Sequence, residues 1–281
     1  MRTVNIDLPW ASRIRLVNLG DAHVGHVNCR EDLLKDVVSL VMADENAYII
    51  DYGDAIDAIN LQDKRFTPSE LASWMTVADL SDIAKAEVAR YVSFLKPAAD
   101  AGRILARLKG NHEDVLSKIF ERDVYNEIND ALSLPQDRRL GVDGFVRLHI
   151  ADNQQPSLTT KRKSATRTGS KQAWTVTAYI HHGYVGGRLS GAKALALQRL
   201  PSAFRADIYA MAHSHDKITL AKQMVTADGP QQIVMLNTGS FLDTYSDGTE
   251  TYGERKGMYP AELGPVEVWL YPDTRKMKMV T

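Results

Sequence analysis

Short apolar runs alternate along the chain with longer amphipathic stretches, and this alternation predicts an ordered series of strands and helices. Five of the apolar runs end in polar turns that are rich in Asp, Asn, His or Gly: residues 13–19, 47–52, 103–108, 174–180 and 207–212. Further runs of β-type residues cover 145–150, 231–237 and 266–271. Runs this short fit either a strand or a buried helix, and the repeated polar ending favours strands.

The amphipathic stretches predict the helices. Apolar positions three and four residues apart indicate helices over 30–43, 68–95, 114–132 and 190–200. The second begins with Pro68-Ser69-Glu70, a helix-start signal. This order of strands and helices predicts an α/β fold with helix-covered sheets and a site at the carboxyl ends of the strands. Because no linker or repeat is visible, residues 1–281 are predicted to form one domain, with a helical insertion at 61–97.

Composition narrows the class of protein. The 281 residues are 44% apolar and 25% charged, which excludes collagen-like and wholly disordered chains. The net charge of −1 argues against a protein-wide basic field for nucleic acid, although a local patch stays open. No apolar window reaches the roughly 18 residues of a transmembrane helix, and the N-terminal segment lacks the apolar stretch of a signal peptide. The only cysteine, Cys29, can form no internal disulfide, so we expect a cytoplasmic protein with no membrane partner.

Histidines cluster rather than scatter. Seven of the eight fall in four short clusters that also hold Asp, Asn or Gly: His23, His26, His112, His181, His182, His213 and His215. Side chains two apart on an extended turn point to the same side, so Asp21 and His23 can bind one cation together. The same spacing gives the same expectation for His213 and His215.

Three further residues complete a candidate metal centre. Asp54 follows Gly53 at a strand end, and its two carboxylate oxygens could bridge two cations. Asn111 offers an amide oxygen and His182 an imidazole nitrogen, whereas His181 points away from His182 in an extended run. Two Asp, one Asn and four His exceed the ligands of one tetrahedral zinc site, which predicts two divalent ions. Nitrogen and oxygen ligands without thiolate suit Mn²⁺ first, with Fe, Zn, Ni or Co as alternatives.

These ordered motifs resemble those of the calcineurin-like metallophosphoesterase superfamily. They span residues 20–215 and read Asp21-x-His23, Gly53-Asp54, Gly110-Asn111-His112-Glu113, His182-Gly183 and His213-x-His215. One position departs from the family pattern, since Ala212 stands where the pattern has Gly. The resemblance implies a four-layer α/β/β/α sandwich with mixed sheets. It also implies one metal on Asp21, His23, Asp54 and His215, and a second metal on Asp54, Asn111, His182 and His213.

The resemblance further implies hydrolysis of phosphate esters by metal-activated hydroxide. In this mechanism His112 is not a metal ligand but lies by the leaving oxygen as general acid or charge stabiliser, and Asp21 holds the His112 imidazole in orientation. A phosphodiesterase or nuclease-like enzyme is the leading hypothesis, because Asp21-x-His23-x-Gly25 also resembles the motif of the family's DNA-repair nucleases. Two alternatives stay open: a phosphomonoesterase acting on nucleotides or phosphoproteins, and a non-catalytic metal-binding scaffold.

Candidate substrate contacts lie outside the ligand set. The segment 153–172 is predicted as a basic hairpin loop that holds Lys161, Arg162 and Lys163, and it is either a solvated loop or an arm that follows nucleic-acid phosphates. Arg188 is placed to reach a substrate phosphate, Tyr184 to stack on a base, and His26 to line the pocket rim. The predicted partner is a phosphate ester, with nucleotides and nucleic acids as candidates. The insertion 61–97 shapes the cleft or forms an oligomer interface, so a dimer is one open state.

Overall fold

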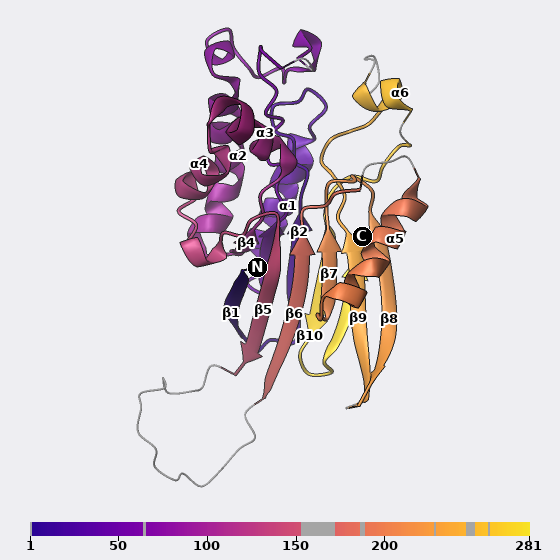
Figure 1. Ribbon diagram of the computed structural model, residues 1–281. Coiled ribbons are helices and arrows are strands. Elements are labelled where there is room, and N and C mark those ends of the chain that lie inside the picture. The colour runs from indigo at the N-terminus through magenta and orange to yellow at the C-terminus, as the bar shows by residue number, and fades with distance from the viewer. Residues whose placement is uncertain are drawn as a thin grey trace.

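Two mixed β-sheets form the centre of the molecule (Figure 1). The computed structural model describes residues 2–63, 66–152, 172–185, 189–227, 229–245, 251–257 and 259–281. Within these ranges, one sheet has the order β1 (Thr3–Pro9), β5 (Asp143–Ala151), β6 (Ala173–His181), β7 (Ile208–Met211), β9 (Gly229–Asn237) and β8 (Ile218–Thr226). The other has the order β11 (Lys276–Val280), β10 (Val266–Tyr271), β2 (Ile14–Leu19), β3 (Ala47–Asp51) and β4 (Ile104–Arg107).

The side chains of β2 show why the sheets pack as inner layers. Successive side chains of a strand point to opposite faces. Ile14 and Leu16 lie in the apolar core between the two sheets, whereas Val17 and Leu19 lie in a second core on the opposite face. Both faces of this strand are therefore buried, which explains why apolar residues on it point to both sides of the sheet.

Helices cover the two outer faces. The described helices are α1 (Glu31–Ala43), α2 (Ile83–Asp100), α3 (Asn111–Phe120), α4 (Val124–Ala131), α5 (Ser190–Ala203) and the short α6 (Tyr252–Lys256). Leu34 of α1, Leu95 of α2 and Ile128 of α4 pack into the second core, against the face that carries Val17. Leu197 of α5 packs against the outer face of the other sheet. Figure 1 shows α2–α4 on one side of the sheets and α5 on the other, so the predicted four-layer α/β/β/α sandwich is confirmed.

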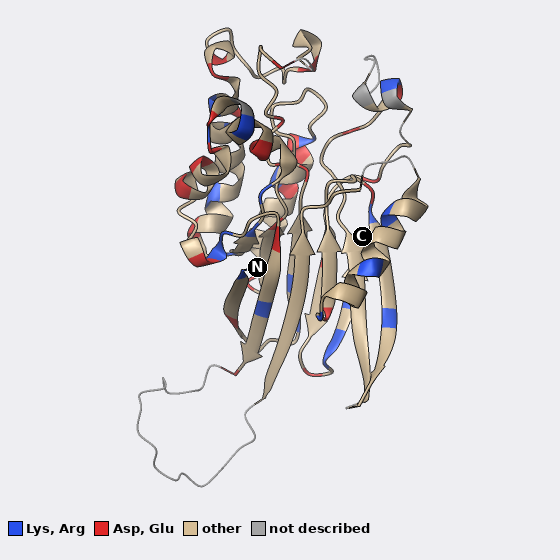
Figure 2. Cartoon of the chain, viewed as in Figure 1, with Lys and Arg blue, Asp and Glu red and all other residues tan. Residues whose placement is uncertain are grey.

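The ends of the parallel strands define the position of the site. Strands β2, β3 and β4 run parallel in one sheet, as do β6, β7 and β9 in the other. β5 and β6 pair antiparallel, as expected for the predicted hairpin, and its connection at 153–171 lies outside the described residues. Charges of both signs are interspersed on the helices α2–α4 (Figure 2). Among the described residues, no helix is long and apolar enough to cross a membrane.

Two helix predictions need correction. The stretch 68–95 is not helical from its start. The helix begins at Ile83, and the side chain of Asp82 caps it by accepting a hydrogen bond from Lys85 N at 3.0 Å. The described residues between 61 and 82 hold only the single 3₁₀ turns Pro68–Glu70 and Asp79–Ser81. The stretch 114–132 is divided between α3 and α4, because Glu121 at the end of α3 is left-handed, with φ 55°. Asp123 then caps α4 by accepting from Asn126 N.

Candidate metal centre

The predicted ligands come from loops that follow five different strands. Asp21 and His23 follow β2, Asp54 follows β3 and Asn111 follows β4. His182 follows β6, and the pair His213 and His215 follows β7. Three groups have ligand atoms that all lie within 4.8 Å of one another: Asp21, His23 and His215; His23, Asp54 and His112; Asp54, His182 and His213. The structure therefore brings together residues that lie up to 194 positions apart in the sequence (215 − 21 = 194).

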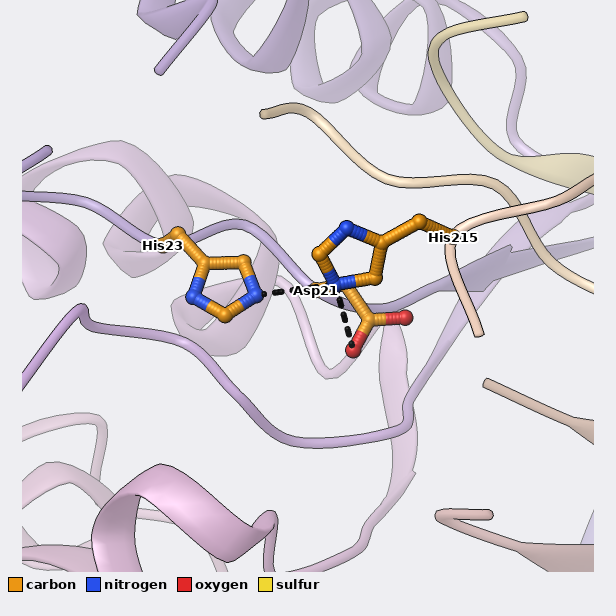
Figure 3. Close-up of side chains that lie close together, drawn as sticks. All are labelled: Asp21, His23 and His215. Atoms are coloured by element: carbon orange, nitrogen blue, oxygen red, sulfur yellow. Dashed lines mark hydrogen bonds and ion pairs between the residues drawn. The ribbon is translucent and has the colours of Figure 1, made fainter. Parts of the chain in front are cut away.

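The first group has the spacing of ligands around one ion. His23 Nε2 lies 3.2 Å from His215 Nε2, and His215 Nε2 lies 4.0 Å from Asp21 Oδ1 (Figure 3). Two nitrogens that each lie about 2.0–2.1 Å from a shared cation are separated by roughly 3 Å. Asp21 Oδ1 is buried and has no hydrogen-bond partner among the described residues. An orphaned carboxylate oxygen beside two imidazoles fits a cation at this position.

In the group of Asp54, His182 and His213, the backbone fixes the tautomer of His182. His182 Nδ1 lies 2.7 Å from Tyr52 O, and this carbonyl can only accept, so Nδ1 carries the hydrogen. In the neutral ring Nε2 then presents a lone pair to Asn111 Oδ1 at 3.0 Å and Asp54 Oδ2 at 3.4 Å. Three acceptors facing one another repel unless a proton or a cation lies between them. Ligand histidines typically donate their other N–H to a carbonyl in this way.

Left-handed backbone, not strand alternation, sets the direction of these side chains, and it places His215 with Asp21 and His23 but His213 with Asp54 and His182. Asp21, His23, Asp54, His213 and His215 have φ values of 52°, 48°, 50°, 68° and 60°. The extended-turn argument for Asp21 with His23, and for His213 with His215, is therefore wrong in its geometry. Such φ values are uncommon for residues other than Gly and cluster at functional sites, where surrounding contacts hold them. One such contact is the bond from His213 N to Asp21 Oδ2 at 2.8 Å.

A close approach of two glycines places Asp54 beside the start of α3. A Cβ on Gly53 would lie 2.3 Å from Gly110 N, and a Cβ on Gly110 would lie 2.1 Å from Asp54 N. Gly53 also has φ 86°, so only glycine fits this crossing without strain. The two predicted motifs, Gly53-Asp54 and Gly110-Asn111, meet at this point.

Ala212, the departure from the family pattern, has a conformation open to alanine. It is not among the residues with positive φ, and its N–H donates to His182 O at 2.9 Å. The extra methyl group is buried without forcing a left-handed backbone.

His112 lies in the group with His23 and Asp54, and Asp57 holds its ring. The ring atom Nδ1 of His112 lies 2.6 Å from Asp57 O, and the backbone N–H of His112 donates to Asp54 Oδ1 at 2.9 Å. The expectation that Asp21 orients the His112 ring needs correction, because the carbonyl of Asp57 makes that contact. The Asp57 carboxylate lies 3.6 Å from His23 Nδ1, so one residue supports both imidazoles. Sequence reasoning missed Asp57, because its contact with the His112 ring is made by a main-chain carbonyl.

The electrostatics of the centre are those of buried carboxylates among imidazoles. Burial raises the pKa of Asp21 to about 7, although nearby His182 lowers it. Burial would also raise the pKa of Asp54, but the adjacent imidazoles of His112 and His182 hold it well below its ordinary value. Burial would lower the pKa of His182, but the Asp54 carboxylate outweighs burial and raises that pKa to about 10. The centre is therefore built to hold positive charge between these side chains.

A pocket of about 560 Å³ opens over the centre. His23, Asp54, His112, His213 and His215 line it, and so does His26, as predicted for the pocket rim. Tyr184 is not among the lining residues; its side chain is 58% exposed and packs edge-on against His181. His181 Nδ1 accepts from Gly183 N, so His181 belongs to the turn and His182 to the centre. Arg188, Lys161, Arg162 and Lys163 lie outside the described residues.

Comparison with known proteins finds similarity in structure only. No protein-family model matches the chain, and no curated protein sequence matches it. Similar solved structures include a metallophosphoesterase from Sphaerobacter thermophilus, with 12% identity, TM-score 0.38, and coverage of 95% of this chain and 87% of that one. Others are the NAD nucleotidase of Haemophilus influenzae (12%, TM-score 0.40, 96% and 49%) and the calcineurin-like phosphoesterase YfkN of Bacillus subtilis (10%, TM-score 0.35, 86% and 88%). At these identities the similarities place no constraint on the substrate.

Proposed function

We propose that the chain is a dinuclear metal-dependent phosphoesterase of the calcineurin-like class, and that it hydrolyses phosphodiesters. One observation carries the proposal: three overlapping groups of candidate ligands, joined through His23 and Asp54, lie beneath a pocket that His112 also lines. Two divalent ions held close together are a known device for in-line displacement at phosphorus.

The proposed ligand sets are those that the sequence resemblance implies. Asp21, His23, Asp54 and His215 would hold the first ion. Asp54, Asn111, His182 and His213 would hold the second. Their nitrogen and oxygen donors suit Mn²⁺, with Fe, Zn, Ni or Co as alternatives. When bound, such ions lower the pKa of a coordinated water and hold the phosphate oxygens.

The residues around the ions have distinct tasks. Because Asp57 O accepts from His112 Nδ1, Nε2 is the atom at which His112 can hold a transferable proton. His112 lines the pocket, so this proton is available to the oxygen that leaves phosphorus. Asp57 supports this role by fixing the ring.

The size of the pocket favours a diester. Among the described residues that line it, Asp57, Glu70, Asp216 and Asp243 are acidic in addition to Asp54, and Lys193 and Arg255 are basic. Two bound divalent ions would offset this surplus of carboxylates, so the charge of the lining does not decide between a monoester and a diester. The pocket volume leaves room for groups on both sides of the phosphorus.

The proposal is tested with Mn²⁺-reconstituted protein. We expect two ions per chain, and faster hydrolysis of bis-p-nitrophenyl phosphate than of p-nitrophenyl phosphate. Asp54→Asn should lose both metal and hydrolysis, whereas the control Asp100→Asn, at an exposed carboxylate paired with Lys96, should lose neither. Saturation at one ion would contradict the dinuclear centre. Two bound ions with no hydrolysis of either ester would favour the metal-binding scaffold instead.

A further inference from the structure

An ion pair joins two walls of the pocket that are far apart in the sequence. The guanidinium of Arg255, on α6, contacts the carboxylate of Glu70, 185 positions away in the chain. Both residues line the pocket that contains the metal centre. α6 lies beyond the carboxyl ends of the strands, at the upper right of Figure 1. The pair therefore stands on the substrate side of the centre.

The wall that carries Glu70 is tied to the first ligand loop. Glu70 O accepts from Val27 N at 2.7 Å, and Ala72 N donates to Gly25 O at 2.8 Å. Gly25 and Val27 lie two and four positions after His23 in the chain. The position of the Glu70 carboxylate is consequently fixed relative to the metal centre.

The wall that carries Arg255 is tied to the same loop from the other side. Thr251 caps α6 and donates through its hydroxyl to Thr244 O. A Cβ on Gly253 would lie 2.3 Å from the Thr244 side chain, so α6 packs closely on this segment. The segment continues to Phe241, whose N–H donates to Asp21 O at 3.0 Å. Arg255 thus has a defined place beside the centre rather than a free position on the surface.

Two basic side chains line the pocket among the described residues, and Arg255 is the one that remains open to a ligand. The other one, Lys193, has a side chain that is only 10% exposed, and its Nζ donates to both Asp216 Oδ2 and Ser214 O at 2.9 Å. The Arg255 side chain is 39% exposed and is opposed by one carboxylate. The Glu70 side chain is 16% exposed, and an ion pair that opens to solvent on its Arg255 side contributes little free energy, so an incoming anion can replace Glu70. The planar guanidinium matches phosphate in a two-pronged contact.

We propose that Arg255 binds a second phosphate of the substrate, away from the phosphorus that reacts, and that Glu70 holds the guanidinium until the substrate replaces it. This inference rests on the proposed phosphoesterase function and refines it, because it assigns the site to esters that carry two phosphates. Glu70 then acts as a competitor of the substrate, not as a support for Arg255. The two residues of the pair should have opposite effects on substrate binding.

Two substrates that differ by one phosphate test the proposal. They are thymidine 5′-(p-nitrophenyl phosphate) and the same ester with a 3′-phosphate, which share the leaving group and the reacting phosphorus. With the Mn²⁺ enzyme we expect a lower KM for the substrate with the 3′-phosphate. In Arg255→Gln this advantage should disappear, a loss of roughly tenfold to a hundredfold for a hydrogen-bonded charge. Arg255→Lys should restore part of it, and Glu70→Gln should enlarge it several-fold.

The controls distinguish a failure of this inference from a failure of the proposed phosphoesterase function. Arg199→Gln, at an exposed position of α5 that does not line the pocket, should leave the ratio of the two KM values unchanged. Equal KM values in the wild-type enzyme, or a change in the same direction for Arg255→Gln and Glu70→Gln, would overturn the role of Arg255 while the phosphoesterase stands. If metal-loaded wild-type protein hydrolyses neither ester, the proposed function itself fails.

Discussion

His112 differs from the other imidazoles of the centre in what its ring contacts. The rings of His23 and His215 face each other through Nε2, and His182 Nε2 faces two ligand oxygens. His112 is anchored through Nδ1 to a carbonyl, and its ring packs edge-on against His23 with 4.6 Å between centroids. A ring held in this way can deliver a proton without being needed to hold an ion. Its loss should therefore affect the chemical step more than the metal content.

We predict that His112→Ala retains both ions and loses turnover by about 10²-fold or more, as expected for a general acid. The loss should be largest for an alkyl phosphodiester, because a poor leaving group needs the proton and p-nitrophenolate does not. Metal analysis, and kcat measured on an alkyl phosphodiester and on a p-nitrophenyl phosphodiester, check this prediction. His149→Ala, on the exposed face of β5, is the matched control. Equal losses on both esters, or loss of an ion, would contradict the acid role.

The candidate ligands could be predicted at the residue scale because their imidazole, carboxylate and amide side chains are the groups that would bind the ions. Asp57 could not, because its contact with His112 uses a main-chain carbonyl that any residue type provides. The left-handed backbone at Asp21 and His23 was also beyond sequence reasoning, since the bonds of their N–H groups to Gly53 O and Asp54 O come from a distant loop.

At the scale of elements, the start of α3 is held by one buried carboxylate. Glu113 Oε2 accepts from Gly110 N and Asp54 N, at 3.0 and 3.1 Å. Glu113 Oε1 accepts from Ala55 N and from the buried guanidinium of Arg107, at 3.0 and 3.1 Å. Arg107 also pairs with Asp51 at the end of β3. This network ties the ends of β3 and β4 to the first turn of the helix that presents Asn111.

We predict that Glu113→Ala lowers the free energy of unfolding by about 3–5 kcal/mol, because it leaves a buried guanidinium and three N–H donors with unmet bonds. Asp114→Ala, one position further along α3, removes a partly exposed carboxylate paired with Lys109 and Lys118 and should cost about 1 kcal/mol or less. Urea unfolding of both variants measures the difference. Similar costs for the two would mean that the network does not hold the helix start.

Elements with a buried stripe could be predicted, whereas those without one could not. β8 leaves most of its side chains at least partly exposed at the sheet edge, so its sequence has no clear period. β1 does alternate, with Val4, Ile6 and Leu8 buried, and that signal was overlooked. The stretch 68–82 has helix-like composition, yet tertiary contacts such as Trp74 Nε1 to Glu31 Oε1 at 2.7 Å hold it in another conformation.

At the scale of the whole molecule, the candidate centre joins the two sheets. Asp21 and Asp54 extend from β2 and β3 of one sheet, and His182 and His213 extend from β6 and β7 of the other. An ion held by Asp54 and His182 would therefore link the carboxyl ends of both sheets. The same segments are separated in the unfolded chain, so bound ions would favour the native state and stabilise it.

We predict that Mn²⁺ at a hundredfold excess over Kd stabilises the protein by about 2.7 kcal/mol for each site that binds only the native state. At about 2–4 °C per kcal/mol for a chain of this size, Tm should rise by roughly 5–11 °C for each occupied site, and by roughly 11–22 °C over the chelator-treated protein when both sites are filled. Calorimetry at matched ionic strength measures the shift. Asp54→Asn removes the shared carboxylate, so it should abolish most of the shift, and Asp100→Asn should preserve it. An unchanged Tm in metal-loaded, active protein would contradict the link between the sheets, since an ion that binds only the native state must stabilise it.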